Sequence, residues 1–367
     1  TSASSTHTWG WQKMLKIENL CVSYGGFKAL HYPLGNYNIP YLYFLCLFSY
    51  SSINDLYLIK LLSIFFDVLL AYGAMMLLGK VRESIPARIA CFFTVLFLPT
   101  VILNGSLWAQ CDSIYVALAV LAIYFALDDR PILSVLFFTL SFGFKLQAVF
   151  LLPVMVVLWL KGKYKLWHFL LFPVFYVLLV LPAVALGKPF LETLTLYASQ
   201  TGSIGDGLNY NSPSVYAFVQ YDPSVTDLAA ASRVGIIAAF VFMGAILAVC
   251  AIKRRSITNG VIVAAAVLFA VGIPFLLPHM HDRYFFAADV LTVVMAYAYV
   301  KYAAAAPLTQ FASLLGYHAY LKMRYLLLMD HGARALIVVL MLGIVLFAQL
   351  LSANGDTGAA GMHTDAE

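Results

Sequence analysis

The sequence predicts an all-α protein that crosses a membrane many times. Of its 367 residues, 63% are hydrophobic and only 11% are charged, and the mean hydropathy is +0.88. A soluble domain of this size cannot bury so much apolar surface, because about 45–50% apolar residues is already typical of such domains. Apolar runs also recur at about the twenty-residue length that a helix needs to cross a bilayer. These observations together predict a polytopic membrane protein.

Ten apolar segments make up the predicted bundle. They are 56–79, 88–104, 113–127, 131–144, 146–160, 167–186, 232–252, 259–278, 284–302 and 333–351. The run IPYLYFLCLF at 39–48 is too short to cross the membrane, so we expect a helix that lies at the membrane edge or is partly buried. The transmembrane domain then covers 36–351 and follows an outer N-terminal segment, 1–35. The small polar residues of 352–367 predict a disordered tail.

The distribution of basic residues predicts the orientation of the bundle. The net charge of +5 comes from short loops, as in the cytoplasmic loops of membrane proteins, and does not indicate a nucleic-acid partner. The loops assigned to the cytoplasm contain Lys80, Arg82, Arg88, Arg130, KGKYK at 161–165, KRR at 253–255 and Lys301. The opposite face receives 35–41, 104–113, 142–147, the long loop 187–231 and 278–283. Because these outer segments hold nearly every unusual polar group, we expect a chemical site on the non-cytoplasmic face.

Two charged residues lie where apolar runs meet the outer face. Asp112 begins a predicted span and could simply cap the helix, since a carboxylate there is favoured by the helix dipole. The functional alternative is a carboxylate that, together with Gln110, acts on a substrate hydroxyl or a cation. Lys145 could snorkel to the interface, or it could bind a phosphate as a compact positive charge. The break in the apolar pattern around Gly143 predicts an irregular helix there.

The segment PHMHDR places His279, His281, Asp282 and Arg283 within five residues. Two histidines and one aspartate give only a weak zinc signal, because the spacing is unlike that of helical metal motifs. A cluster that receives a phosphate leaving group fits better, since arginine offers a planar pair of donors and histidine can donate a proton. The structural alternative is an interfacial network that closes a helix end. Polar groups are costly at a membrane edge, which favours the functional interpretation.

Other polar residues have less specific interpretations. Asp67 lies inside a predicted span, where it must find a partner within the bundle, and we expect a structural role. Asn36, Tyr37 and Gln147 are candidates for substrate contact. The two residues in GNYNIPY could equally shape a re-entrant turn.

Four stretches occur in an order known from one protein family: GGFKAL…GNYNIPYLYF, LWAQCDSIYVAL, FGFKLQAVFLLP and FLLPHMHDRYFF. In these stretches, which extend over 24–290, the chain resembles the bacterial relatives of the GPI-anchor mannosyltransferases, within the GT-C class of polytopic glycosyltransferases. It is similar, more distantly, to dolichol-dependent glucosyltransferases. The resemblance implies a GT-C-like helical bundle with outer-face loops in a bacterial inner membrane.

The resemblance also implies an activity. A sugar, which would be a hexose such as mannose, is transferred with inversion from a polyprenyl phosphate to a lipid or glycan acceptor. Asp112 matches an outer-loop acid of the family and is the expected catalytic residue. Lys145, His279, His281 and Arg283 match positions expected to meet phosphate or donor sugar. A requirement for a divalent metal ion stays open, and no other cofactor is expected.

One part of the sequence departs from the family. Its members have a first spanning helix followed by an outer-loop aspartate, whereas TSASSTHTWGWQKMLKIENL has no span and Glu18 as its only acid. Either the true start lies elsewhere or the chain has lost this base. The second case predicts an inactive GT-C-fold subunit of a larger membrane complex. A transporter of lipid-linked substrates or solutes is a third hypothesis, supported only by the buried charges.

Overall fold

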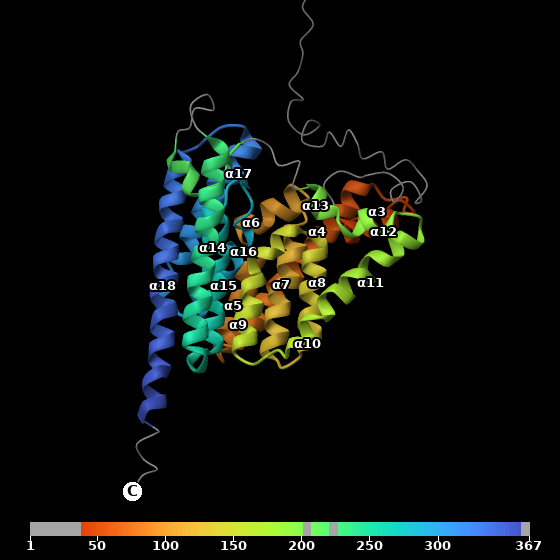
Figure 1. Cartoon of the computed structure of the whole chain (residues 1–367). Helices are drawn as coiled ribbons and strands as arrows, with labels where there is room; N and C mark the ends of the chain where they lie inside the picture. The colour runs from red at the N-terminus through yellow and green to blue at the C-terminus, as the bar shows by residue number, and fades with distance from the viewer. Residues whose placement is uncertain (1–37, 201–206, 220–226, 361–367) are drawn as a thin grey trace, which may run out of the picture.

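The structure, a computed structural model, describes residues 38–200, 207–219 and 227–360. Within these ranges it is helical apart from two very short strands, which confirms the predicted all-α class (Figure 1). The N-terminal segment 1–35, and with it the predicted contacts of Asn36 and Tyr37, lies outside the described residues.

The predicted segments correspond to helices. The first half contains α3 (Ile39–Phe48), α4 (Asp55–Leu78), α5 (Ile85–Leu96), α6 (Pro99–Ile102), the π-helical turn η1 (Leu103–Leu107), α7 (Asp112–Leu127), α8 (Pro131–Phe144), η2 (Leu146–Leu151) and α9 (Leu152–Leu160). The second half contains α10 (Leu166–Phe169), α11 (Leu171–Ala185), α12 (Phe190–Leu194), α13 (Leu196–Gln200), η4 (Val215–Phe218), α14 (Leu228–Ile252), η5 (Arg254–Ser256), α15 (Asn259–Leu276), α16 (Phe286–Ala298), η6 (Val300–Tyr302), α17 (Ala305–Lys322) and α18 (Met329–Ala360).

The number of helices that can cross a membrane is smaller than predicted. Among the described residues, five are long and apolar enough, and a sixth span results if α5 and the bent α6–η1 segment count as one. The expected count of about ten is therefore not confirmed. Several of the shorter apolar helices end at the polar residues identified above: α7 begins at Asp112, α8 ends just before Lys145, and α16 begins soon after Arg283.

The long helices α14, α15 and α18 lie side by side, whereas α11 leans away from the bundle toward α3 and α12 (Figure 1). Helix α15 lies at the centre, where its neighbours bury 89% of its residues. Its small residues, among them Gly260 and Gly272, allow close packing of the surrounding helices.

The basic loops meet at one end of the bundle, as their sorting predicts. Lys80 Nζ lies 2.5 Å from Asp128 Oδ1, and Arg130 Nε lies 3.1 Å from Asp128 Oδ2. Lys161 Nζ donates to the Ile257 carbonyl at 2.8 Å, and the Asn259 side chain donates to the Lys80 carbonyl at 2.8 Å. These contacts join the loops after α4, α7, α9 and α14. We refer to this end as the basic end.

Two features of the C-terminal half differ from the prediction. Helix α17 was not predicted, because polar residues such as Thr309, Gln310 and Ser313 interrupt its apolar pattern. In the fold these polar residues are buried against α6 and α16. Helix α18 continues to Ala360, so the first part of the segment expected to be disordered is helical.

Candidate functional site

The carboxylate of Asp112 is the centre of a polar cluster at the end of the bundle opposite the basic end. Lys145 Nζ forms a close ion pair with Asp112 Oδ1. Arg283 Nε lies 3.5 Å from Asp112 Oδ2, and the Asn104 amide donates to the same oxygen at 2.7 Å. The structure thus brings together the outer segments 104–113, 142–147 and 278–283, as the sequence predicts.

Lys145 reaches Asp112 because the chain is broken between α8 and α9. Its backbone is extended, with φ −153° and ψ 131°, so α8 ends at Phe144 and a 3₁₀ turn follows. The last carbonyls of α8 would otherwise lack partners. The Asn38 amide donates to the Gly143 carbonyl at 2.7 Å, and the Tyr197 hydroxyl donates to the Phe142 carbonyl at 2.7 Å. The predicted irregular helix is confirmed.

Asn104 belongs to the cluster, although no sequence pattern predicts a role for it. It lies on η1, a π-helical turn, and such turns often occur at functional sites. Its amide nitrogen donates to Asp112 and also to the Tyr317 hydroxyl at 2.8 Å. Both residues are completely buried. Tyr317 lies on the unpredicted α17, so no sequence pattern linked it to Asn104.

Arg283 connects the cluster to the PHMHDR segment. Its guanidinium carbon lies 5.1 Å from the centre of the Trp108 ring, in a cation–π contact. Burial opposes its charge, but the carboxylates of Asp112 and Asp282 outweigh burial and raise the pKa of Arg283 above its usual value. Arg283 is therefore a permanent cation held between two acids and an aromatic ring.

Asp282 is the least satisfied group of the site. Its side chain is only 2% exposed, and within the described part of the chain no side chain donates a hydrogen bond to either carboxylate oxygen. Arg283 Nη1 is 3.9 Å from its Oδ1. Burial raises the pKa of Asp282 to about 6, partly offset by the positive charge of Arg283. Unlike Asp112, this carboxyl group has free lone pairs.

The two histidines face different partners. His279 has φ +62°, and its Nδ1 lies 2.7 Å from the Gly207 carbonyl oxygen while its Nε2 lies 3.1 Å from Ser232 Oγ. His281 stacks on Tyr210, with ring centres 4.8 Å apart. Burial, together with the charges of Arg283 and Lys145, lowers the pKa of His281 to about 4. His281 is consequently neutral near pH 7 and adds no positive charge to the site.

Short strands hold the PHMHDR segment in place. Strand β2 (Met280–His281) pairs in parallel with β1 (Asn209–Tyr210), which comes from the long outer loop. Gly316 of α17 lies against this pair of segments. A side chain there would lie 2.8 Å from the Asn211 carbonyl oxygen and 2.9 Å from that of Asp282. The loop 187–231 is thus partly structured, as expected, and its described part supports the site.

The remaining predicted residues have smaller roles in the geometry. Gln147 interacts with the Tyr284 hydroxyl. Gln110 contributes its backbone, which accepts from Ser63 Oγ at 3.2 Å and donates to the Asn104 carbonyl at 2.9 Å. Asp67 finds its partner inside the bundle, where Ser113 Oγ donates to it.

A further buried acid lies on α16. Asp289 is fully buried, its Oδ1 accepts from Ser313 Oγ at 2.8 Å, and Thr100 and Gln310 are further hydrogen-bonding neighbours. The described residues contain no group of three or more histidine, cysteine or acidic side chains placed to hold a metal ion. No metal ligands are therefore assigned.

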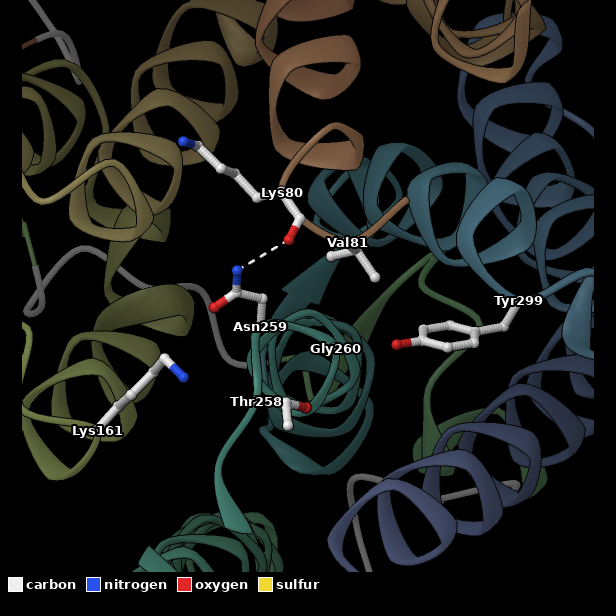
Figure 2. Close-up of a pocket in the computed structure, with 7 residues that line it drawn as sticks. All are labelled: Lys80, Val81, Lys161, Thr258, Asn259, Gly260 and Tyr299. Carbon is white, nitrogen blue, oxygen red and sulfur yellow. Dashed lines mark hydrogen bonds between the residues drawn. The ribbon is translucent and has the colours of Figure 1, made fainter. Parts of the chain in front are cut away.

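The cluster is closely packed. The side chain of Asp112 is 1% exposed, that of Lys145 is 13% exposed and that of Arg283 is 22% exposed. Solvent therefore reaches the cluster at the two cations. A cavity of about 400 Å³ that is lined by described residues lies at the basic end (Figure 2). The site is characterised by its charges and contacts.

Comparison with known proteins adds no assignment to this geometry. No protein-family model matches the chain, and no curated protein matches it. The resemblance to GT-C glycosyltransferases therefore stays a prediction based on the ordered motifs.

Proposed function

We propose that the protein is a membrane glycosyltransferase that transfers a hexose from a polyprenyl phosphate to a lipid or glycan acceptor. The observation that carries this proposal is the convergence of Lys145 and Arg283 on the buried Asp112, opposite the basic end. Two fixed cations at one end of a membrane bundle are suited to a phosphate leaving group. The positive-inside rule supports a non-cytoplasmic position of the cluster. The bacterial inner membrane is proposed from the resemblance in sequence.

The reaction needs a base as well as cations. The acceptor oxygen bonds to the anomeric carbon as the bond from that carbon to the phosphate oxygen breaks, which inverts the configuration. The electron pair of the broken bond leaves with the phosphate, next to Lys145 and Arg283. The proton of the acceptor hydroxyl passes to a carboxylate. Asp282 suits this step better than Asp112, because among the described residues no side chain donates a hydrogen bond to its oxygens.

Asp112 then has a different role from the one expected from its position. With the Asn104 amide and two cations beside it, Asp112 holds Lys145 and Arg283 in position. The expectation that it is catalytic becomes the proposal that it positions Lys145 and Arg283 for the phosphate.

The test uses the purified chain and a short-chain polyprenyl-phosphate mannose carrying a radiolabel. Asp112→Asn, Arg283→Ala and Asp282→Asn are each expected to abolish transfer while the protein still elutes as a folded species. Arg334→Ala removes an exposed arginine of α18 that pairs with Asp330, outside the cluster, and should leave transfer unchanged. Full activity of both Asp112→Asn and Arg283→Ala would sink the proposal.

A structural subunit without activity is the second candidate. The observation that favours it is the closed packing of the cluster, since Asp112 is 1% exposed and already paired with both cations. In that case the cluster fixes the ends of α7, α8 and α16 to one another. This alternative predicts stable co-purification with other membrane proteins and no transfer by the wild-type chain. Turnover by the purified chain alone rejects it.

A further inference from the structure

A cavity of about 400 Å³ opens at the basic end, far along the bundle from the Asp112 cluster. Its lining comes from four places in the chain. They are the turn after α4 (Lys80, Val81), the end of α9 (Lys161), the start of α15 (Thr258, Asn259, Gly260) and the residue after α16 (Tyr299). In Figure 2, the Lys161 side chain and the Tyr299 hydroxyl point toward the first turn of α15 from opposite sides.

Lys161 has no negative partner in this cavity. Its ammonium donates to the Ile257 carbonyl at 2.8 Å, which leaves further N–H groups available. No acidic side chain of the described residues lies within ion-pair distance of it, whereas Lys163 pairs with Asp129 and Lys80 pairs with Asp128. Burial lowers the pKa of Lys161, and the nearby charge of Lys163 lowers it further. A partly buried cation beside an open cavity favours an anion in that cavity.

The cavity also offers uncharged donors. The Tyr299 hydroxyl has no hydrogen bond to another described residue, and Gly260 allows it to approach the helix because a side chain there would collide with it. The first backbone N–H groups of a helix have no acceptor within the helix. Thr258 caps one of them, that of Val261, at 3.3 Å, which leaves those of Asn259 and Gly260. These donors line the same cavity as Lys161, so an anion with several oxygen atoms finds more than one donor there.

The surroundings of the cavity strengthen its positive potential. The basic end carries Lys80, Arg82, Arg88, Arg130, Lys163, Lys165, Lys253, Arg254, Arg255 and Lys301, against the acids Glu83, Asp128 and Asp129. The cavity lies at the ends of α4 and α15, which are candidate membrane spans, and lipid headgroups are expected at the ends of such spans. Basic pockets between the ends of membrane helices are suited to anionic headgroups.

We propose that this cavity binds a phosphate group, held by Lys161, Tyr299 and the first turn of α15. The ligand class is a phosphate ester of a membrane lipid or a free phosphate, and the two share the same recognition. This site is separate from the Asp112 cluster, and it does not depend on the function proposed above.

The experiment measures binding to the full chain in a zwitterionic detergent. The probes are a short-chain phosphatidylglycerol, the matching phosphatidylcholine and inorganic phosphate, each titrated with thermal unfolding as the readout. Phosphatidylglycerol is expected to raise the unfolding temperature of the wild type. Stabilisation by inorganic phosphate at the same concentration identifies a free-phosphate site, and stabilisation by phosphatidylglycerol alone identifies a lipid site.

Two variants of equal charge provide the control. Lys161→Gln is expected to weaken binding at least ten-fold, whereas Lys163→Gln, two residues away in the same loop, should weaken it less than two-fold. Tyr299→Phe, which removes only the hydroxyl, should weaken it by a smaller factor and keeps the test valid if Lys161→Gln unfolds. Equal effects of the two lysine variants, or no stabilisation of the wild type by any anion, overturn the proposal.

Discussion

The carboxylate of Asp112 contacts three groups: the Lys145 ammonium, the Arg283 guanidinium and the Asn104 amide. It is almost completely buried. Taking one partner out of a buried ion pair is far more damaging than replacing the pair as a whole, because the remaining charge has no compensation. The stability of this end of the bundle therefore depends on Asp112.

Asp112→Asn should lower the free energy of unfolding by about 3–5 kcal/mol, because Lys145 and Arg283 lose their shared anion. The measurement is chemical unfolding in detergent micelles. Asp129→Asn, which removes an exposed acid paired with Lys163, should change it by less than about 1 kcal/mol. Combining Asp112→Asn with Lys145→Met should recover part of the loss. Equal, small effects of Asp112→Asn and Asp129→Asn would contradict this role.

The pKa shifts of Asp282 and His281 change the stability of the protein in opposite directions over the same pH range. The folded-state pKa of Asp282 is raised to about 6, so the native state binds more protons than the unfolded state between about pH 4 and 6. Its contribution to stability is therefore lost as the pH rises through 6. The folded-state pKa of His281 is lowered to about 4, so its contribution is lost as the pH falls from about 6.5 to 4.

This opposition predicts two variants with opposite pH dependence. Between pH 4 and 6, His281→Gln should become less stable as the pH rises, by up to about 2–3 kcal/mol, because only the Asp282 contribution remains. Asp282→Asn should become more stable over the same interval. Unfolding free energies measured at half-unit steps of pH test both. Identical pH profiles for the two variants would show that these side chains are not buried as described.

At the scale of helices, the site depends on where the elements end and on how α17 packs. Gly316 permits α17 to contact the backbone of both the outer loop and the PHMHDR segment. The neighbouring atoms at Asn211 and Asp282 are backbone atoms, so they cannot rotate away from an added side chain.

Gly316→Ala should therefore destabilise the protein by about 1–3 kcal/mol, because α17 must move away from these segments. Gly244→Ala in α14 is the matched control, since an added methyl group meets nothing within 4 Å. That control should be neutral or more stable by up to about 1 kcal/mol, because alanine favours the helix. Thermal unfolding of the two variants side by side gives the comparison, and a stable Gly316→Ala protein would contradict the described packing.

Helix positions were more predictable than helix partners. The apolar runs 39–48 and 131–144 coincide with α3 and α8, because hydrophobicity and the following polar residue mark their ends. Helix α17 was missed because its buried polar residues pair only in the folded state. The contact between Asn104 and Tyr317 joins residues 213 positions apart, and no local pattern in one sequence specifies such a pair. The different roles proposed for Asp112 and Asp282 likewise depend on neighbours from other helices.

At the scale of the whole molecule, charge divides the bundle into two ends. Ion pairs and backbone contacts join the basic loops at one end, and the acid–cation cluster lies at the other. The positive-inside rule predicts that the basic end faces the cytoplasm.

Labelling of single cysteines tests this orientation. The background variant replaces all five native cysteines with serine: Cys21, Cys46, Cys91, Cys111 and Cys250. A membrane-impermeant thiol reagent added to intact spheroplasts should then label Leu191→Cys, on the exposed side of α12, and should not label Lys253→Cys until the membrane is opened. The reverse pattern would place the Asp112 cluster in the cytoplasm.

In the Asp112 cluster, the carboxylate of Asp112 competes with any other anion for Lys145 and Arg283. Lys145 and Arg283 already hold a carboxylate, so chloride or free phosphate must displace a partner that is tethered in place and always present. A small ion gains little else from the exchange, whereas a ligand with a long hydrocarbon chain also gains from burying that chain in the bilayer. The internal ion pairs would thus weaken the binding of small anions and favour an anion whose hydrocarbon chain lies in the bilayer.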